Sequence, residues 1–310
     1  MSTIRLRTIE ERDRGEVAEL IAVSMNTWDI AHGLAPGRFT GGSPQTDVFY
    51  TVYERLDPGG CVVAESAENG RLAASCYHRE RETHLSLGIM NVHPNYFGKG
   101  VARDVLDYVT DLADASGKPL RLVSSVMNLE SFSLYTRAGF VPRVLYQDLL
   151  VTVPDAGFAT SVPGAERVRD ATPDDVDAMV EVELAVSGIS RAKDYRTFIE
   201  NADGFWGISV LEEGRGRLGG YLASIGHPLF NEIGPGVARS EAHGAALLLR
   251  ELNRYPGRTP LVLVPCEATE LVALLYRLGG RNCELHAAQV RGPSQPFAGV
   301  SFPTFMPETG

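Results

Sequence analysis

The stretch Val92-His93-Pro94-Asn95-Tyr96-Phe97-Gly98-Lys99-Gly100-Val101-Ala102 decides the fold of this chain. An apolar run from Leu85 to Val92 precedes it and predicts a strand, and apolar residues at helical spacing follow from Val101 onward. A strand that enters a helix through a glycine turn points several backbone N–H groups in one direction, and the helix dipole adds partial positive charge there. Because Gly98 and Gly100 lack a Cβ, an anion can approach the backbone closely. The stretch predicts a diphosphate site, although in a chain with 32 glycines it can also be an ordinary turn.

A second helix start lies about thirty residues further along the chain. Leu120 to Val123 reads as a strand, and Asn128 is a residue type that caps helix N-termini. Tyr135 then falls late in the predicted helix, which Gly139 is expected to end.

Together, the two stretches resemble the GNAT N-acetyltransferases. The pattern of that family is Arg/Gln-x-x-Gly-x-Gly/Ala after the fourth strand, followed by Asn, six residues and Tyr, and then by Gly-Phe. Phe97 to Ala102 fits the first part at every position except the opening one, and Asn128 to Tyr135 with Gly139-Phe140 fits the second part completely. The resemblance implies an α/β fold of the α+β type, with a mixed, mostly antiparallel twisted sheet flanked by helices. It also implies acetyl-CoA as co-substrate.

The same resemblance implies which residues hold acetyl-CoA. Phe97 departs from the family pattern, and it is expected either to pack on the cofactor or to anchor the loop. Lys99 and Arg103 can supply positive charge, or can be solvated residues at a helix start. The full predicted set is Asn91, Val92, Phe97, Gly98, Lys99, Gly100, Val101, Ala102, Arg103, Asn128, Ser131 and Tyr135.

The catalytic residues follow from what acetyl transfer requires. In this family a tyrosine protonates the departing thiolate, which implies that role for Tyr135; the alternative is a core tyrosine whose hydroxyl bonds the backbone. Many members have a glutamate base on the fourth strand, but that position is Ser86 here. His84, on the same predicted strand from Thr83 to Val92, can relay a proton through water, or can be structural. Attack by the amine without an enzymatic base is equally open.

Alternating and periodic patterns predict the remaining elements of the first half. The residues between 29 and 46, rich in Gly, Pro and Ser, are expected to form a loop beside the acceptor pocket. Side chains that can line this pocket are Trp28, Asp29, His32, Tyr50, Tyr53 and Tyr77. The predicted elements are strands at 4–7, 61–64, 72–78, 83–92 and 146–153 and helices at 16–25 and 47–55.

Residues 154–166 have linker composition, and after them the order of predicted strands and helices begins again. The strand at 167–171 echoes the strand at 5–9, and a hairpin and further helices follow in a similar order. Gly234-Pro235-Gly236 lies too early for the helix predicted at 244–252, Glu241 would repel a diphosphate, and Thr269 stands where Asn128 does. We therefore predict two tandem GNAT-like domains, with an intact copy at 1–153 and a degenerate copy at 167–310.

Composition limits the partners. A net charge of −10 disfavours nucleic acid and anionic membranes, and no apolar run approaches the ~20 residues of a membrane span. The four scattered cysteines show no metal or disulfide spacing, so we predict no metal and a cytoplasmic location, and leave a homodimer open. The predicted function is acetyl-CoA-dependent N-acetylation of a small primary amine. The alternative is a non-catalytic CoA or acyl-CoA sensor or scaffold.

Overall fold

The structure is a computed structural model that describes residues 4–33 and 39–305. The described chain divides into two compact units. Residues 4–80, 85–120 and Phe305 belong to the first unit, and residues 81–84 and 121–304 belong to the second. Within the described ranges, no helix is both long enough and apolar enough to cross a bilayer.

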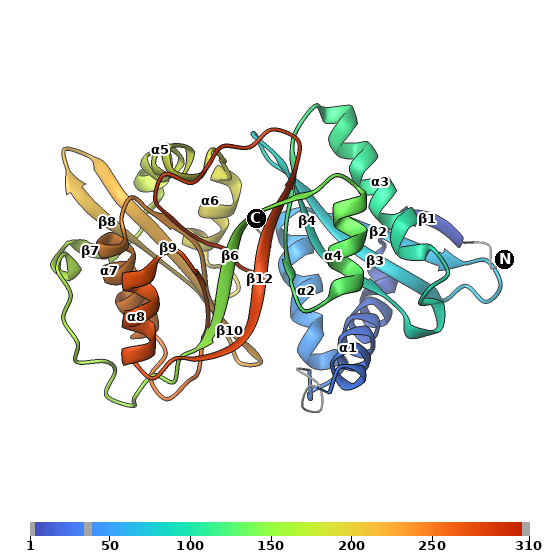
Figure 1. The fold of residues 1–310 in the computed structure, drawn as a ribbon, viewed down its shortest axis with the longest axis horizontal. Coiled ribbons are helices and arrows are strands. Elements are labelled where there is room, and N and C mark those ends of the chain that lie inside the picture. Colours follow the sequence, from blue (N-terminus) through green and yellow to red (C-terminus); the bar gives the residue numbers. More distant parts are fainter. Residues whose placement is uncertain (1–3, 34–38, 306–310) are drawn as a thin grey trace. The chain divides into compact units, whose positions relative to one another are not determined.

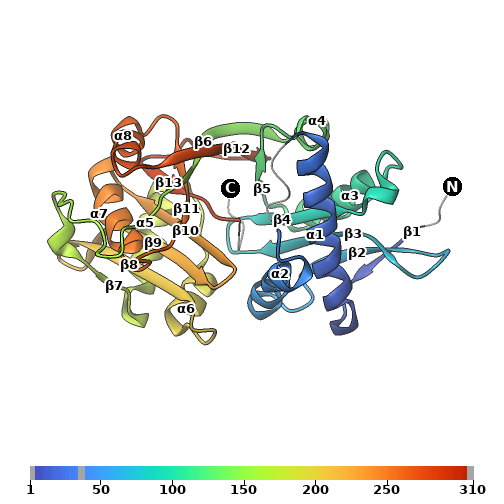
Figure 2. The same ribbon diagram turned by 90° about the horizontal axis from the view of Figure 1, so that it is seen from below.

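The first unit is an antiparallel sheet in the order β1-β2-β3-β4, covered by helices. Residues of β3 are buried at consecutive positions, so both faces of the sheet are covered, and α1 and α3 both pack against β3 and β4. Figure 2 shows these helices around the strands. The elements are β1 (Ile4–Thr8), α1 (Arg14–Ala31), α2 (Ser43–Leu56), β2 (Cys61–Ser66), β3 (Leu72–Glu80), β4 (Leu85–Val92) and α3 (Val101–Ser116).

The second unit contains strands in the order β5-β12-β6-β11-β10-β9-β8-β7. Most neighbours are antiparallel, while β10 and β11 are parallel. The strands are β5 (Leu120–Ser125), β6 (Val141–Leu150), β7 (Val168–Asp170), β8 (Trp206–Gly214), β9 (Arg217–His227), β10 (Phe230–Ala238), β11 (Leu261–Pro265), β12 (Arg281–Arg291) and β13 (Val300–Phe302). The helices are α4 (Leu129–Arg137), α5 (Val176–Ser187), α6 (Ala192–Glu200), α7 (Glu241–Leu252) and α8 (Thr269–Arg277).

The two copies of the repeat exchange a strand. β6, which follows α4 in the first copy, lies between β12 and β11 of the second copy, while β12 lies between β5 and β6 (Figure 1). As a result, β5, α4 and β6 cluster with the second unit, and the compact units do not divide at the predicted domain boundary near residue 153. The boundaries 1–153, 154–166 and 167–310 therefore stay a prediction about the repeat, not a description of the compact units.

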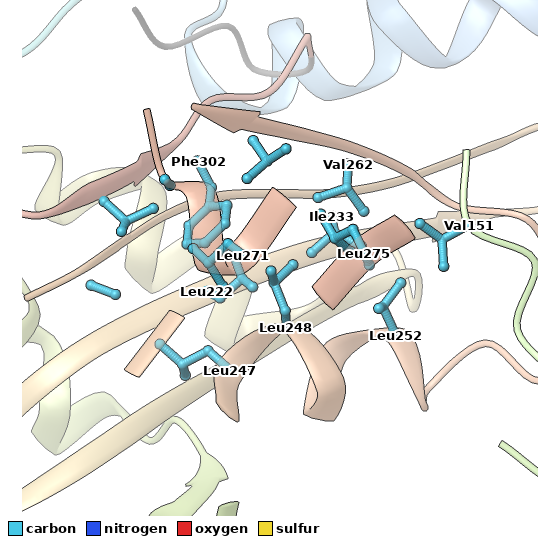
Figure 3. Close-up of a cluster of buried hydrophobic side chains, with 14 of the residues drawn as sticks. Val151, Leu222, Ile233, Leu247, Leu248, Leu252, Val262, Leu271, Leu275 and Phe302 are labelled. Atoms are coloured by element: carbon cyan, nitrogen blue, oxygen red, sulfur yellow. The ribbon is translucent and has the colours of Figure 1, made fainter. Parts of the chain in front are cut away.

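An apolar core holds α7 and α8 against the sheet of the second unit (Figure 3). Leu248 and Leu252 of α7 and Leu271 and Leu275 of α8 are completely or almost completely buried. They pack with β-strand residues such as Ile233 in a single cluster. Burial of side chains of this size contributes roughly 1.5–3 kcal/mol each, so this core holds α7 and α8 on the sheet.

A matching ion-pair network at the start of each copy supports the predicted repeat. In the first copy, Arg7 binds Asp13 through two hydrogen bonds of 2.6 and 2.9 Å and also binds Glu65. In the second, Arg169 binds Asp175 through two hydrogen bonds of 2.7 Å and also binds Glu212. In both networks the aspartate also accepts a main-chain N–H three residues earlier, from Glu10 and from Thr172.

Asp175 makes the second copy sensitive to acid. Hydrogen bonding to Arg169 lowers the pKa of Asp175 from 3.8 to about 2. Because the folded-state pKa lies below the unfolded value, the network stabilises the fold above about pH 4 and loses that contribution as pH falls to about 2. We expect Asp175→Asn to lower the free energy of unfolding by about 2 kcal/mol at pH 7. Its thermal midpoint should converge with that of the wild type at pH 2.

Asp174→Asn is the matched control, because Asp174 is the exposed neighbour of Asp175. Equal losses of stability in the two variants at pH 7 would contradict the role given to the Arg169–Asp175 pair.

Several predicted boundaries differ from the structure. The helix predicted at 16–25 runs from Arg14 to Ala31, and α2 begins at Ser43, so the predicted loop at 29–46 shortens to 32–42, of which 34–38 lie outside the described residues. The helix predicted at 244 begins at Glu241. The strand predicted from Thr83 begins at Leu85, which leaves His84 outside it. These shifts of two to six residues reflect tertiary packing beyond the local pattern.

Candidate functional site

The glycine turn joins β4 to α3 within the first unit. A short 3-10 helix at Pro94–Tyr96 follows β4, and His93 Nδ1 accepts the main-chain N–H of Asn95 at 3.2 Å. Gly98 (φ +72°) and Gly100 (φ +88°) both adopt the left-handed conformation that favours glycine. The predicted sequence of strand, glycine turn and helix is confirmed.

The space next to this turn suits a diphosphate. A Cβ placed on Gly98 or Gly100 would have no protein atom within 4 Å, so the turn has open space on the side where a side chain would project. Gly100 is the N-cap of α3 and offers no side-chain cap to the first N–H groups of this helix. These donors and the dipole of a 16-residue helix suit the charge of an anion, so the residues present fit the diphosphate of CoA.

The side chains predicted to bind the cofactor around the turn differ in their exposure to solvent. Phe97 is 49% exposed, so it does not anchor the loop in a core. Lys99 and Arg103 are also exposed, and Lys99 Nζ lies 5.2 Å from the centre of the Tyr96 ring. Val101 is buried under the helix start and Ala102 is half-buried, which leaves their main-chain groups, not their side chains, as the parts that can bind.

The second motif forms the helix start that its residues predict. Asn128 Oδ1 accepts the N–H of Ser131 at 3.0 Å and caps α4, and Gly139 (φ +89°) follows its end. Tyr135 is 6% exposed, and its ring packs edge-on against Phe140 with centroids 5.7 Å apart. This motif belongs to the second unit, whereas the glycine turn belongs to the first.

The two candidates for the base are both buried. His84 is 1% exposed and lies in the turn before β4, where its Nδ1 is 3.0 Å from Thr83 Oγ1. That turn groups with the second unit, in which Thr83 Oγ1 also accepts the N–H of Ser190 at 2.9 Å. Ser86, at the position of the family glutamate, is 1% exposed and carries no carboxylate. His84 is therefore not on the predicted strand face.

A β-bulge interrupts β4 before the predicted main-chain donors. Cys76 pairs with Met90 and His78 with Leu87, so Gly88 and Ile89 together face the single residue Tyr77 of β3. A bulge bends its strand and removes a residue from regular pairing, and bulges are common beside active sites. The isolated Gly88 inside an apolar run was the sequence signal for it, and it was missed.

Asn91 and Val92 follow the bulge and pair with Ser75 and Ala74. The side chain of Asn91 is 6% exposed and donates to Ser24 Oγ of α1 at 2.7 Å, so α1 and β4 are tied together beside the glycine turn.

Four of the residues named for the acceptor pocket form aromatic pairs in the first unit. The rings of Tyr53 and Tyr77 stack with centroids 4.3 Å apart, and both are buried. Trp28 stacks on His32 near the end of α1, with centroids 4.2 Å apart. Trp28 and His32 lie at the end of α1 that leads into the connection to α2, whereas Tyr53 and Tyr77 are packed inside the first unit.

The second copy has lost the glycine turn. Eight residues, 93–100, separate β4 from α3, but only two, 239–240, separate β10 from α7. Gly234 and Gly236 lie inside β10, where a Cβ on Gly236 would come within 2.5 Å of the carbonyl oxygen of Tyr221. These glycines therefore allow close packing of strands and do not form a phosphate cradle.

Glu241 places a carboxylate where the second copy would need to bind an anion. Its Oε2 accepts the N–H groups of Glu270 and Leu271, at 2.7 and 3.0 Å, and so caps the start of α8. A diphosphate there would meet a negative charge already paired with these donors. The geometry agrees with the predicted degeneration of the second copy.

Comparison with known proteins gives a family for the first part of the chain. Residues 28–140 match the model of the acetyltransferase (GNAT) family. A stretch of 73 residues is 33% identical to part of the UPF0157 protein YqkA of Bacillus subtilis (strain 168). That stretch covers 24% of this chain and only 21% of the relative, so the chain matches about a fifth of that protein's length.

Solved structures share the fold of the whole chain at low sequence identity. A "Putative Acetyltransferase" from Pyrococcus horikoshii has a TM-score of 0.73 at 14% identity, with 98% of this chain and 95% of that chain covered. A GCN5-related N-acetyltransferase from Sphaerobacter thermophilus has a TM-score of 0.65 at 17% identity, with 96% and 98% covered. A tandem GNAT protein from the clavulanic acid biosynthesis pathway has a TM-score of 0.58 at 15% identity, with 94% and 100% covered. The match to the GNAT acetyltransferase family therefore covers residues 28–140, and the chain as a whole shares the fold of these solved structures, one of which is a tandem GNAT protein.

Proposed function

We propose that this chain is an acetyl-CoA-dependent N-acetyltransferase that acts on the primary amine of a small molecule. The observation that carries the proposal is the glycine turn, in which Gly98 and Gly100 leave open space beside the uncapped start of α3. This turn would hold the diphosphate of CoA, with Lys99 and Arg103 adding positive charge. When bound, acetyl-CoA supplies the activated acetyl group.

The residues of the chain have three tasks in this reaction. Main-chain N–H groups of β4 around Asn91 and Val92 stabilise negative charge that develops on the acetyl oxygen. Tyr135 donates a proton to the departing thiolate. The amine attacks directly while both substrates are bound, so no acyl group is carried on the protein.

Deprotonation of the amine does not need a residue of the chain in this proposal. A free alkyl amine has a pKa of about 10.4, so only a small neutral fraction exists near pH 7. With Ser86 at the glutamate position and His84 buried, the proposal assigns this step to the amine's own equilibrium with water. The rate constant kcat/KM should then rise tenfold per pH unit from pH 6 to 9. A plateau above about pH 6.5 would instead assign the step to a histidine.

A non-catalytic CoA sensor is the second candidate, and the absence of a carboxylate at Ser86 favours it. The two candidates differ in turnover. The assay measures release of free CoA from acetyl-CoA with a thiol reagent, over a panel of amino sugars, polyamines and amino acids. An enzyme should release CoA at a rate that depends on the amine. Binding of acetyl-CoA without turnover on any amine would overturn the enzymatic proposal and support the sensor.

A further inference from the structure

Two carboxylates and an imidazole converge in the second unit, and none of the three has a role in the proposed function. One ligand atom each from Asp148, Glu284 and His286 lies within 4.8 Å of the other two. The side chains of Asp148 and His286 are 2% and 6% exposed, and Glu284 is half-buried. None of the four cysteines, on which the prediction of no metal rested, belongs to this set.

The strand register explains why these side chains meet. The strands β6 and β12 lie side by side (Figure 1). Asp148 of β6 lies directly opposite Glu284 of β12, and His286 lies opposite Tyr146, two residues further along each strand. Because side chains two apart on a strand share a face, all three groups project from the same face of the sheet. His286 reaches Asp148 diagonally, with Nδ1 2.8 Å from Oδ2.

A bulge sets this register. The pairing shifts between Asn282 and Glu284, so Cys283 is an additional residue in β12. Asn282 Oδ1 accepts the N–H of Glu284 at 3.2 Å, and Cys283 Sγ donates to the carbonyl oxygen of Asp148 at 3.4 Å. If pairing continued regularly from Asn282, Cys283 would lie opposite Asp148, and Glu284 would lie opposite Gln147 on the other face of the sheet.

The charges call for a cation. Two carboxylates directly opposite each other on neighbouring strands repel, and burial strengthens the repulsion. A divalent cation bound between them offsets this repulsion and turns both carboxylates into ligands.

We infer that Asp148, Glu284 and His286 form a zinc site that joins β6 of the first copy to β12 of the second. Zinc binds carboxylate oxygen and imidazole nitrogen at about 2.0–2.2 Å, and three protein ligands with a water in the fourth position are a familiar arrangement. Ligand atoms then lie about 3.4 Å apart, which these side chains reach by small rotations from within their 4.8 Å cluster. The site fastens the exchanged strands to each other.

The test uses the full chain, stripped of metal with a chelator and desalted. After addition of Zn²⁺ and a second desalting, atomic spectrometry should find one zinc per chain. The thermal midpoint should be about 5 °C higher than that of the stripped protein. Glu284→Gln, the gentlest change because Glu284 is only half-buried, should weaken zinc binding at least about tenfold, and His286→Gln should do the same.

Two variants serve as controls. Glu267→Gln removes an exposed carboxylate of the same unit, and Cys283→Ser removes the neighbouring thiol; both should retain one zinc. No retained zinc and no shift in the wild type would overturn the inference and leave an ion pair between Asp148 and His286. Retention that persists in both Glu284→Gln and His286→Gln, or that is lost in Cys283→Ser, would also overturn it.

Discussion

Gly98→Glu and Gly100→Glu should each abolish the rise in thermal midpoint that acetyl-CoA produces in the wild-type protein. A ligand at 100 times its dissociation constant adds about 2.7 kcal/mol to the free energy of unfolding, which corresponds to about 5 °C for a chain of this size. A side chain at either position would fill the open space beside the turn. Its carboxylate would also repel the diphosphate, by about 4 kcal/mol at 4 Å in a surface environment.

Gly117→Glu is the matched control for both effects of the substitution. Gly117 has φ +67° at the opposite end of α3, and a Cβ there also meets no atom within 4 Å. The control therefore adds the same charge and a similar backbone strain within the same unit, with the 16 residues of α3 between it and the glycine turn. It should keep the full 5 °C rise relative to its own ligand-free midpoint.

Two results would count against this site. A full rise in Gly98→Glu and Gly100→Glu would place acetyl-CoA elsewhere in the chain. Loss of the rise in Gly117→Glu as well would show that strain in the first unit, not repulsion at the turn, prevents binding. Glu241→Gln tests the second copy: its ligand-induced rise should equal that of the wild type, because the proposal gives that copy no part in cofactor binding.

Local chemistry made the two helix starts predictable. Gly98 and Gly100 adopt the conformation that glycine favours, and Asn128 caps α4 with its own side chain, so short stretches of sequence carry the necessary information. The Arg169–Asp175 pair was not predicted, although its residues lie only six apart and repeat the spacing of Arg7 and Asp13. Interactions that span a few residues leave a readable pattern.

Long-range pairing was not predictable in this way. The position of β12 between β5 and β6 depends on contacts between residues about 140 apart, such as Glu284 with Asp148, and no local periodicity encodes them. The strand β10 was missed because Gly234-Pro235-Gly236 lowers strand propensity, while burial of its neighbours imposes the strand. The helix α6 was missed because Tyr195 and Phe198 are nearly its only apolar residues.

In the candidate site, too, some features could be predicted from local sequence and others depended on long-range pairing. The glycine turn and the Asn128 cap follow from sequence, whereas the location of His84 depended on where β4 begins. An error of two residues there moved His84 from a strand face into a buried turn. The bulge at Gly88 and Ile89 depends on pairing with β3, and a single glycine was its only trace in the sequence.

Tyr135→Phe should lower kcat about 100-fold and change the dissociation constant of acetyl-CoA by no more than about twofold. General acids typically contribute 10²–10⁴-fold to a rate, and a 100-fold loss corresponds to about 2.7 kcal/mol in the activation free energy. The ring of Tyr135 packs against Phe140, and phenylalanine keeps this contact, so the variant removes the proton donor and leaves the packing in place.

Tyr276 of α8 is the matched control, because it occupies the position in the second copy that corresponds to Tyr135 in the first. Tyr276 is 46% exposed and donates its hydroxyl hydrogen to Gln147 Oε1 at 2.7 Å, so Tyr276→Phe removes the same atom from a copy without a cofactor turn. Steady-state kinetics with saturating acetyl-CoA should show wild-type kcat for Tyr276→Phe. A wild-type kcat in Tyr135→Phe would mean that Tyr135 is a core tyrosine and that the thiolate leaves without a proton from it. A loss of acetyl-CoA binding would instead assign Tyr135 to holding the cofactor.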